Sequence, residues 1–293
     1  MSSVSKLDYK MDYLVVRNQE GTKRIHLSEI SVLILESTAI SLTAYLLCEL
    51  SKWKIDVIFC DEKRCPYGVL STLYGSHDTS LKYRKQIAWG QEAKDFVWAE
   101  IIRAKILGQW SVLSEERADA RLLLDGYAQE VLPGDMTNRE GHAAKVYFNA
   151  LFGMSFSRSQ ENNTNAALNY GYGILLSIVA REITANGYCT QLGIFHDNMF
   201  NEFNLACDFM EPFRPFIDFT VSEMELSDFG HKEKVQIVRT LNEQIKIGGQ
   251  KQYMLNAIRI YVKSVLDALE EKDISLVRFP SYELSFYEND HFL

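Results

Sequence analysis

Three carboxylates and one histidine in the second half of the sequence are the residues best suited to chemistry. Glu140 lies in NREGHAA at the expected start of a helix, and His196 follows the apolar run in LGIFHDN. Asp208 and Glu211 stand three residues apart in ACDFMEPFRP, so on a helix they share one face, where two carboxylates repel unless a cation joins them. Pro212 puts Glu211 at the end of that helix, where the dipole disfavours an acid.

Oxygen ligands with one imidazole suit Mg²⁺ or Mn²⁺ rather than zinc, because no thiolate joins the set. Such an ion binds phosphate oxygens, polarises phosphorus and helps to deprotonate an attacking water or hydroxyl. Structural explanations compete with this one, since the helix dipole favours Glu140 and His196 could be a hydrogen-bonded residue at a domain edge. Local sequence alone favours the structural explanation for these two residues, and the metal explanation only for Asp208 with Glu211.

Basic side chains form small clusters that could contact DNA phosphates. Lys82, Arg84 and Lys85 surround an aromatic residue in LKYRK, and Arg158 lies in SFSRSQ. Each cluster also fits an ordinary solvated surface, but an interleaved aromatic makes LKYRK the better candidate for nucleic acid. The formal net charge of −8 argues against a protein that coats DNA non-specifically.

Composition indicates an ordinary soluble globular protein of one large or two modest domains. The chain has 293 residues, of which 47% are apolar and 24% are charged. No apolar stretch reaches the roughly 18 residues that suggest a transmembrane helix, and the polar first ten residues do not resemble a signal peptide. Five widely spaced cysteines without a C-x-x-C pair predict reduced thiols in a cytoplasmic protein.

The first 75 residues predict a β-rich, sandwich-like domain. Residues 13–17 and 23–27 are short β-branched runs around NQEG, which is typical of a hairpin. Residues 30–35 and 55–60 predict buried strands, and residues 43–52 have helical spacing with Thr43 as N-cap.

A helical period begins after residue 78 and predicts a larger, all-α domain over residues 80–293, so the fold class is α+β. Helices are predicted at 81–113 with a break near Gly90 or Gly108, and at 115–131, 140–152, 165–186, 200–209, 233–247 and 252–271. The tail after Asp273 shows no periodicity and predicts a mobile end.

The sequence resembles a known family in segments that run in order from about residue 5 to about residue 218. They are SKLDYK, IHLSEI, VIFCDEKRCP, LYGSHDTSLKYRKQIAW, NREGHAAKVYFNALFG, NAALNYGYGILLS, LGIFHDN and FNLACDFMEPFRP. Together they resemble the CRISPR-associated integrase of spacer acquisition, in its type II-A form. No single segment would be specific, but the combination is.

The resemblance implies a metal site on Glu140, His196 and Glu211, with Asp208 as a second acid that many members carry. It implies Mg²⁺- or Mn²⁺-dependent transesterification, in which 3′-hydroxyl ends of a prespacer duplex attack the CRISPR leader–repeat, with DNA endonuclease activity from attack by water. The N-terminal domain is then expected to support dimerisation and to brace DNA. A homodimer, a small ferredoxin-like partner in a heterohexamer, a ring-shaped accessory protein and the effector nuclease are the implied partners.

The sequence differs from the family at one place, and two alternative functions are open. Type II-A relatives begin with an extra strand before the SKLxYK segment, whereas only four residues precede it here, so we expect a missing edge strand or a misassigned start codon. His142, His196, Asp197 and Asp208 could instead form the site of an HD-type nucleotide phosphohydrolase, although His142 and Glu140 should point to different faces of a helix. A non-catalytic DNA-binding scaffold is the second alternative.

Overall fold

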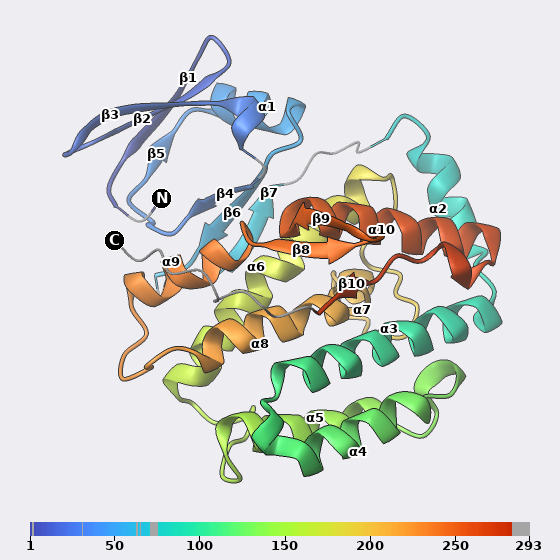
Figure 1. Cartoon of the computed structure of the whole chain (residues 1–293). Helices are drawn as coiled ribbons and strands as arrows, with labels where there is room; N and C mark the ends of the chain where they lie inside the picture. Colours follow the sequence, from blue (N-terminus) through green and yellow to red (C-terminus); the bar gives the residue numbers. More distant parts are fainter. Residues whose placement is uncertain (2, 31, 63, 65, 71–75, 283–293) are drawn as a thin grey trace.

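The computed structural model describes residues 1–282 except residues 2, 31, 63, 65 and 71–75 (Figure 1). Its N-terminal region contains one sheet with the strand order β3-β2-β1-β5 and a second with the order β4-β6-β7. The elements are β1 (Lys6–Lys10), β2 (Tyr13–Asn18), β3 (Gly21–His26), β4 (Val32–Leu35), β5 (Ser41–Leu42), α1 (Ala44–Lys52), β6 (Asp56–Cys60) and β7 (Pro66–Leu70).

The predicted hairpin and helix of this region are confirmed. Strands β2 and β3 pair antiparallel, and the Thr43 side chain caps α1 by accepting a hydrogen bond from the backbone N–H of Leu46 at 3.2 Å. Strand β1 was not predicted from the sequence, because only Leu7 of its five residues is buried and the hydrophobic signal is correspondingly weak. The backbone of Met1 hydrogen-bonds beside β4, where its amino group donates to the Ile34 carbonyl at 2.8 Å.

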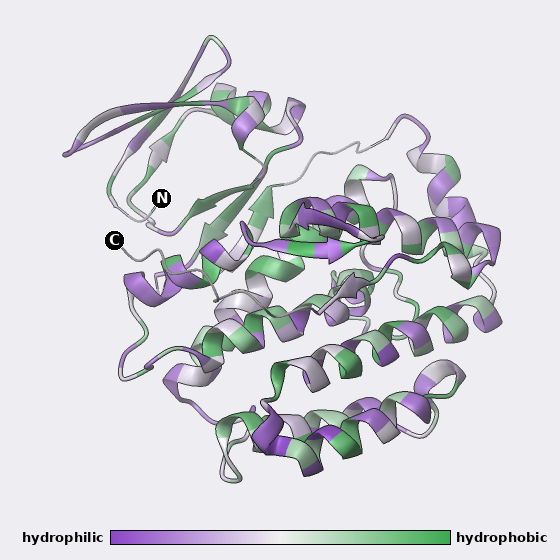
Figure 2. Cartoon of the chain, viewed as in Figure 1, coloured by the Kyte–Doolittle hydropathy of each residue, from purple (hydrophilic) through white to green (hydrophobic). Residues whose placement is uncertain are grey.

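The second sheet lies between the two hydrophobic cores. In β4, Leu33 and Leu35 belong to the core of the N-terminal region, whereas Val32 and Ile34 pack against the core of the helical region. This alternation follows from the two-residue period of a strand. Strands β4, β6 and β7 are accordingly mostly hydrophobic in Figure 2, unlike the hairpin of β2 and β3. The division into domains 1–75 and 80–293 stays a prediction.

Nine α-helices are described after residue 78, and they supply most of the larger core. They are α2 (Thr79–Ile87), α3 (Gln91–Val112), α4 (Ala118–Gln129), α5 (Arg139–Phe152), α6 (Asn163–Ala185), α7 (Asn204–Met210), α8 (Arg214–Ser222), α9 (His231–Thr240) and α10 (Met254–Glu271). The predicted break occurs at Gly90, the N-cap of α3. Gly108 instead lies inside α3, where an added Cβ would come within 2.9 Å of Pro215.

The predicted α+β class, with N-terminal strands followed by a helical region, is confirmed, but the helical region is not all-α as predicted. A three-stranded sheet of order β10-β8-β9 lies within it, formed by β8 (Gln244–Ile247), β9 (Gln250–Tyr253) and β10 (Pro280–Ser281). The predicted helix at 233–247 therefore ends at Thr240. Alternating burial of Ile245 and Ile247, followed by Gly248 and Gly249 at positive φ, produces a hairpin rather than a helix.

The prediction of a mobile tail was also wrong as far as the structure describes it. β10 pairs with β8, and the Tyr282 hydroxyl donates a hydrogen bond to the Pro212 carbonyl at 2.5 Å. The Tyr282 ring also stacks on Phe216, with ring centroids 5.1 Å apart. The rest of the tail, from residue 283, lies outside the described residues. In the part of the chain that is described, no helix is long and apolar enough to cross a membrane.

Candidate metal centre

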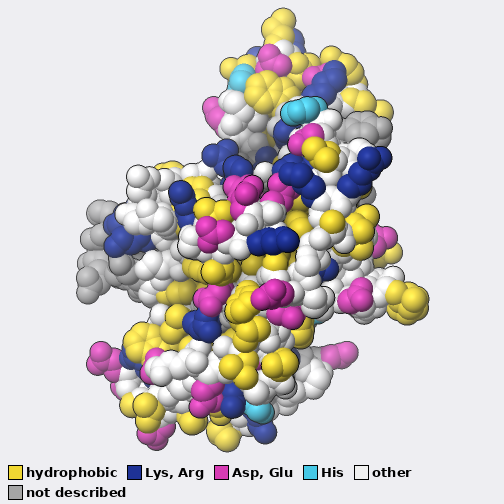
Figure 3. All heavy atoms as spheres, turned by 90° about the vertical axis from the view of Figure 1, so that its right-hand side faces the viewer, with side chains coloured by type: hydrophobic (Ala, Val, Ile, Leu, Met, Phe, Trp, Pro, Cys, Tyr) yellow, Lys and Arg dark blue, Asp and Glu magenta, His cyan; other side chains and the backbone are white. Residues whose placement is uncertain are grey.

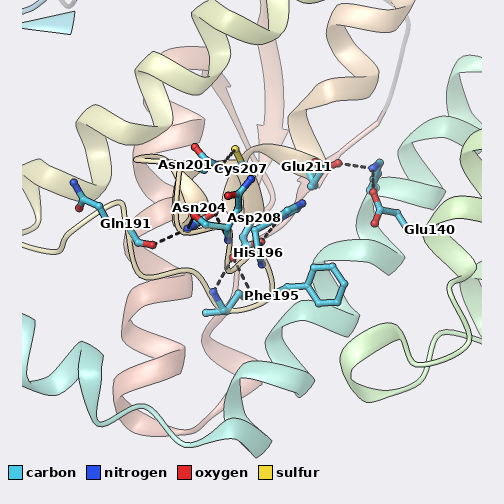
Figure 4. Close-up of polar contacts among 12 residues, drawn as sticks. Glu140, Gln191, Phe195, His196, Asn201, Asn204, Cys207, Asp208 and Glu211 are labelled. Carbon is cyan, nitrogen blue, oxygen red and sulfur yellow. Dashed lines mark hydrogen bonds and ion pairs between the residues drawn. The ribbon is translucent and has the colours of Figure 1, made fainter. Parts of the chain in front are cut away.

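A loop between α6 and α7 carries His196, and a buried carboxylate determines its shape. Asp208, on α7, is completely buried. Its oxygens accept hydrogen bonds from the backbone N–H groups of Ile194, Phe195 and His196, at 2.7, 3.1 and 3.1 Å. A carboxylate has enough lone pairs for all three donors. The loop is therefore folded around Asp208 (Figure 4).

The same carboxylate fixes the imidazole. Asp208 Oδ1 lies 2.6 Å from Nδ1 of His196, and this hydrogen bond raises the pKa of His196 against the opposing effect of burial. When Nδ1 carries its hydrogen toward Asp208, Nε2 keeps a lone pair for a ligand. The His196 side chain is 40% exposed, so it is open to a substrate. This contact supports a positioning role for Asp208, and direct metal binding by Asp208 stays a prediction.

Two further residues hold the loop, and neither was singled out from the sequence. An added Cβ at Gly193 would lie 2.2 Å from the His196 carbonyl oxygen and 2.8 Å from Asp208 Oδ2, so only glycine fits. The Asn204 side chain donates to the carbonyl oxygens of Gln191 and Asn198, both at 3.0 Å. The G-x-x-H spacing of LGIFHDN was the available signal for Gly193.

An aromatic pair covers one side of His196. The rings of Trp98, on α3, and Phe195 are stacked with centroids 4.3 Å apart. His196 meets both rings edge-on, at 5.8 and 5.5 Å. This packing restricts the orientation of the imidazole and keeps water from that side.

Glu140 lies in the first turn of α5, as predicted. Asp135 accepts hydrogen bonds from the backbone N–H groups of Arg139 and Glu140, at 2.8 and 3.0 Å, and Asn138 caps Gly141 at 3.3 Å. Asn138 has a left-handed φ of 51°, which asparagine tolerates better than most residues. These caps fix the start of α5 and so the position of Glu140.

Glu211 directly follows α7 and is held by two cations. Its Oε1 lies 2.7 Å from the Arg214 guanidinium and its Oε2 lies 2.5 Å from the Lys105 ammonium. Burial alone would raise the pKa of Glu211, but Arg214 and Lys105 overcome burial and lower the pKa to about 2. Lys105 Nζ also lies 2.6 Å from Glu140 Oε1, so one ammonium joins both acids (Figure 4).

Glu140, His196 and Glu211, the three predicted ligands, are therefore not arranged around a common position for a metal ion. Among the described residues, no group of three His, Cys, Asp or Glu side chains is arranged to hold a metal ion. The hydrogen bond from His196 to Asp208 is the main cause of the raised pKa of His196, and the negative charges of Glu211 and Glu140 add to it. Glu211 Oε2 is buried and has no hydrogen bond of good geometry, only its ion pair. Two carboxylates and an imidazole nitrogen are donors that Mg²⁺ or Mn²⁺ accepts, so the residues fit such an ion chemically.

The geometry disfavours the phosphohydrolase alternative. His142 is exposed and contacts the Tyr127 ring, with centroids 6.0 Å apart, whereas Glu140 faces Lys105. Asp197 is exposed as well, and its neighbour His196 is bound to Asp208 instead. The two histidines of an HD-type site are thus not brought together.

The predicted DNA-binding side chains are only partly available. Lys82 and Lys85, on α2, both pair with Glu270, at 3.3 and 2.8 Å. Arg158 donates to the side chains of Asn165 and Asn169. Arg84 is exposed and has no ion pair among the described residues. Figure 3 shows Lys and Arg interspersed with acidic side chains on the face that carries α2, rather than a continuous basic surface.

Comparisons of the sequence and of the fold with known proteins identify CRISPR-associated proteins and a casposase as similar to this chain. A family model described as CRISPR associated protein Cas1 matches residues 1–228. The chain is 36% identical over 284 residues to the CRISPR-associated endonuclease Cas1 of Neisseria meningitidis serogroup C (strain 8013). The alignment covers 94% of this chain and 92% of that protein. Its fold is similar to a casposase bound to integration product, with a TM-score of 0.75, 19% identity and coverage of 99% and 94%. It is also similar to a Cas6-RT-Cas1–Cas2 complex, with a TM-score of 0.71, 15% identity and coverage of 97% of this chain and 36% of that chain.

Proposed function

Because this chain belongs to the Cas1 family of CRISPR-associated proteins, we propose that it is a metal-dependent DNA integrase and endonuclease of spacer acquisition. It would join 3′-hydroxyl ends of prespacer DNA to the CRISPR repeat by transesterification. One observation supports this reaction most directly. The carboxylates of Glu140 and Glu211 both contact the Lys105 ammonium, and the third proposed ligand, His196, is oriented by Asp208. The type II-A form stays a prediction.

Glu140, Glu211 and Nε2 of His196 would hold the Mg²⁺ or Mn²⁺ ion. When bound, such an ion stabilises negative charge on the scissile phosphate and lowers the pKa of an attacking hydroxyl or water. The protein's own residues prepare the site. Asp208 sets the tautomer of His196, and Trp98 with Phe195 excludes water from one side of the ring. Arg214 offsets the charge of Glu211 at Oε1, the oxygen that Lys105 does not contact.

DNA phosphates would contact Lys82, Arg84, Lys85 and Arg158. Arg84 is the best placed of these, because Lys82 and Lys85 would first have to leave Glu270. The contacts would be largely independent of sequence, since phosphates are the same at every position. The prespacer duplex and the leader–repeat are the proposed DNA partners.

The proposed assembly is a homodimer that joins a small ferredoxin-like partner in a heterohexamer. The fold similarity to a Cas6-RT-Cas1–Cas2 complex supports a Cas protein as partner. A ring-shaped accessory protein and the effector nuclease are further proposed partners, and action on the host's CRISPR DNA would take place in the cytoplasm.

A strand-transfer assay on a supercoiled CRISPR-bearing plasmid with Mn²⁺ and the partner protein tests the function. His196→Ala should abolish both joining and cleavage while leaving DNA binding in a gel-shift assay intact. His142→Ala is the matched control and should be as active as the wild type, because His142 lies away from Glu211 and Asp208.

Three outcomes would contradict the proposal. A His196→Ala variant that joins DNA at the wild-type rate would exclude His196 from the site. A loss of activity in His142→Ala would instead favour the phosphohydrolase arrangement. A wild-type protein that binds prespacer DNA but neither joins nor cleaves it in the complete assembly would be the non-catalytic scaffold.

A further inference from the structure

Lys105 stands between the two acids that the proposed ion would bind. Its side chain, on α3, is 6% exposed, and its Nζ contacts Glu140 Oε1 at 2.6 Å and Glu211 Oε2 at 2.5 Å. Because both oxygens touch one nitrogen, they lie within about 5 Å of each other. Among the described residues, no other cation contacts both acids, since Arg214 reaches Glu211 alone.

The three charged groups depend on one another in the metal-free protein. Glu211 is 4% exposed and Glu140 is 26% exposed, so their mutual repulsion is only partly screened by water. A buried ammonium, in turn, is costly unless carboxylates pair with it. Lys105 thus explains how two acids can be kept side by side before any metal binds.

We propose that Lys105 is a resident cation that holds Glu140 and Glu211 together without metal and releases both oxygens when a divalent ion binds. The inference rests on the metal-dependent function proposed above. Lys105 Nζ occupies the position between the two carboxylate oxygens, and Mg²⁺ takes such oxygens at about 2.0–2.1 Å, so an ion that bridges them would take the place of the ammonium. Their like charges also repel at such a separation.

The same helix offers the released ammonium a second partner. Gln109 lies one turn after Lys105 on α3, is 2% exposed, and its Oε1 has no hydrogen-bond partner among the described residues. Residues four apart on a helix are neighbours, and the long lysine side chain is flexible enough to change partner. An unpaired buried amide oxygen is costly, so an arriving ammonium would be stabilised there.

Mn²⁺ titrations followed by calorimetry and by electron paramagnetic resonance test the inference without any measurement of catalysis. Lys105→Met should bind Mn²⁺ at least about tenfold more tightly than the wild type, which corresponds to about 1.4 kcal/mol, because no ammonium has to leave. Its melting temperature should fall in EDTA and rise more steeply with Mn²⁺ than that of the wild type. Lys263→Met, which removes an exposed lysine paired with Asp267, is the control and should change neither quantity.

Gln109→Met provides the second variant. It removes an unpaired oxygen at nearly constant volume, so the metal-free protein should be no less stable, whereas Mn²⁺ should bind several-fold more weakly. A folded Lys105→Met protein that binds Mn²⁺ equally or more weakly than the wild type would overturn the inference. Binding of Mn²⁺ that is the same in wild type and Glu140→Gln would instead contradict the proposed metal site, whatever Lys105 does.

Discussion

Replacing Asp208 with asparagine tests how the His196 loop is held. The carboxylate accepts three backbone N–H groups and faces Nδ1 of His196, two donors at each oxygen. In Asp208→Asn, one oxygen becomes an NH₂ group that cannot accept, so two of the four hydrogen bonds are lost in either orientation of the amide. The fold leaves no water to replace them, because Asp208 is completely buried.

The expected cost follows from those two bonds. Hydrogen bonds to a charged group contribute roughly 1.5–3 kcal/mol each, so Asp208→Asn should lose roughly 3–6 kcal/mol of unfolding free energy. At about 2 °C per kcal/mol for a chain of this size, the melting temperature should fall by roughly 6–12 °C. The pKa of His196 should also fall, because its hydrogen bond to Asp208 is the main cause of its elevation.

Thermal melts and NMR titration of the His196 ring measure these two quantities. Asp197→Asn is the matched control, because Asp197 is an exposed acid next to the same histidine and should leave the melting temperature unchanged. Mn²⁺ affinity should fall by about 10–100-fold in Asp208→Asn, as for other residues that orient a metal ligand. An Asp208→Asn protein that melts with the wild type and keeps the pKa of His196 would refute the reasoning.

Three more perturbations have defined outcomes. Gly193→Ala should reduce strand transfer at least about tenfold, because the added Cβ would lie 2.2 Å from the His196 carbonyl oxygen. Gly126→Ala is the control and should not reduce strand transfer, because its added Cβ meets nothing within 4 Å. Equal activity of the two variants would contradict the account. Burial, partly offset by Arg181, raises the pKa of Asp56 to about 7, so this residue destabilises the fold progressively as pH rises from 4 to 7. Asp56→Asn should therefore gain up to about 4 kcal/mol at pH 8 and little at pH 4 in urea unfolding, and a pH-independent difference would disprove the cause. Glu270→Gln releases Lys82 and Lys85, so it should tighten DNA binding several-fold at low salt and steepen the salt dependence, and unchanged binding would remove both lysines from the DNA interface.

Sequence patterns identified the elements whose signals are local. The Thr43 cap, the hairpin of β2 and β3 and the break at Gly90 each depend on a few adjacent residues, and all three predictions were confirmed. The hairpin of β8 and β9 was missed although its Gly248-Gly249 turn was visible, because the predicted helices on either side of the turn were extended over β8 and into β9. β10 has no local signal, since its pairing with β8 joins segments more than thirty residues apart.

The candidate site shows the same limit. Glu140, His196 and Glu211 are side chains of recognisable chemistry, and the structure brings them into one neighbourhood. Lys105 could not be assigned from the sequence, because it lies in a helical apolar pattern 35 residues before Glu140 and its role appears only when α3 packs beside α5 and α7. Asp208 was predicted beside the site, but its contact with three backbone N–H groups depends on how the loop folds.

The most direct test of the central claim is a crystal structure of the protein with Mn²⁺, with the ion located by its anomalous scattering. The account predicts one strong peak in contact with carboxylate oxygens of Glu140 and Glu211 and with Nε2 of His196, at about 2.0–2.3 Å, and with Lys105 turned away from both acids. A peak bound elsewhere, or one that leaves His196 or Glu140 uncoordinated while Lys105 still joins the two acids, would contradict it.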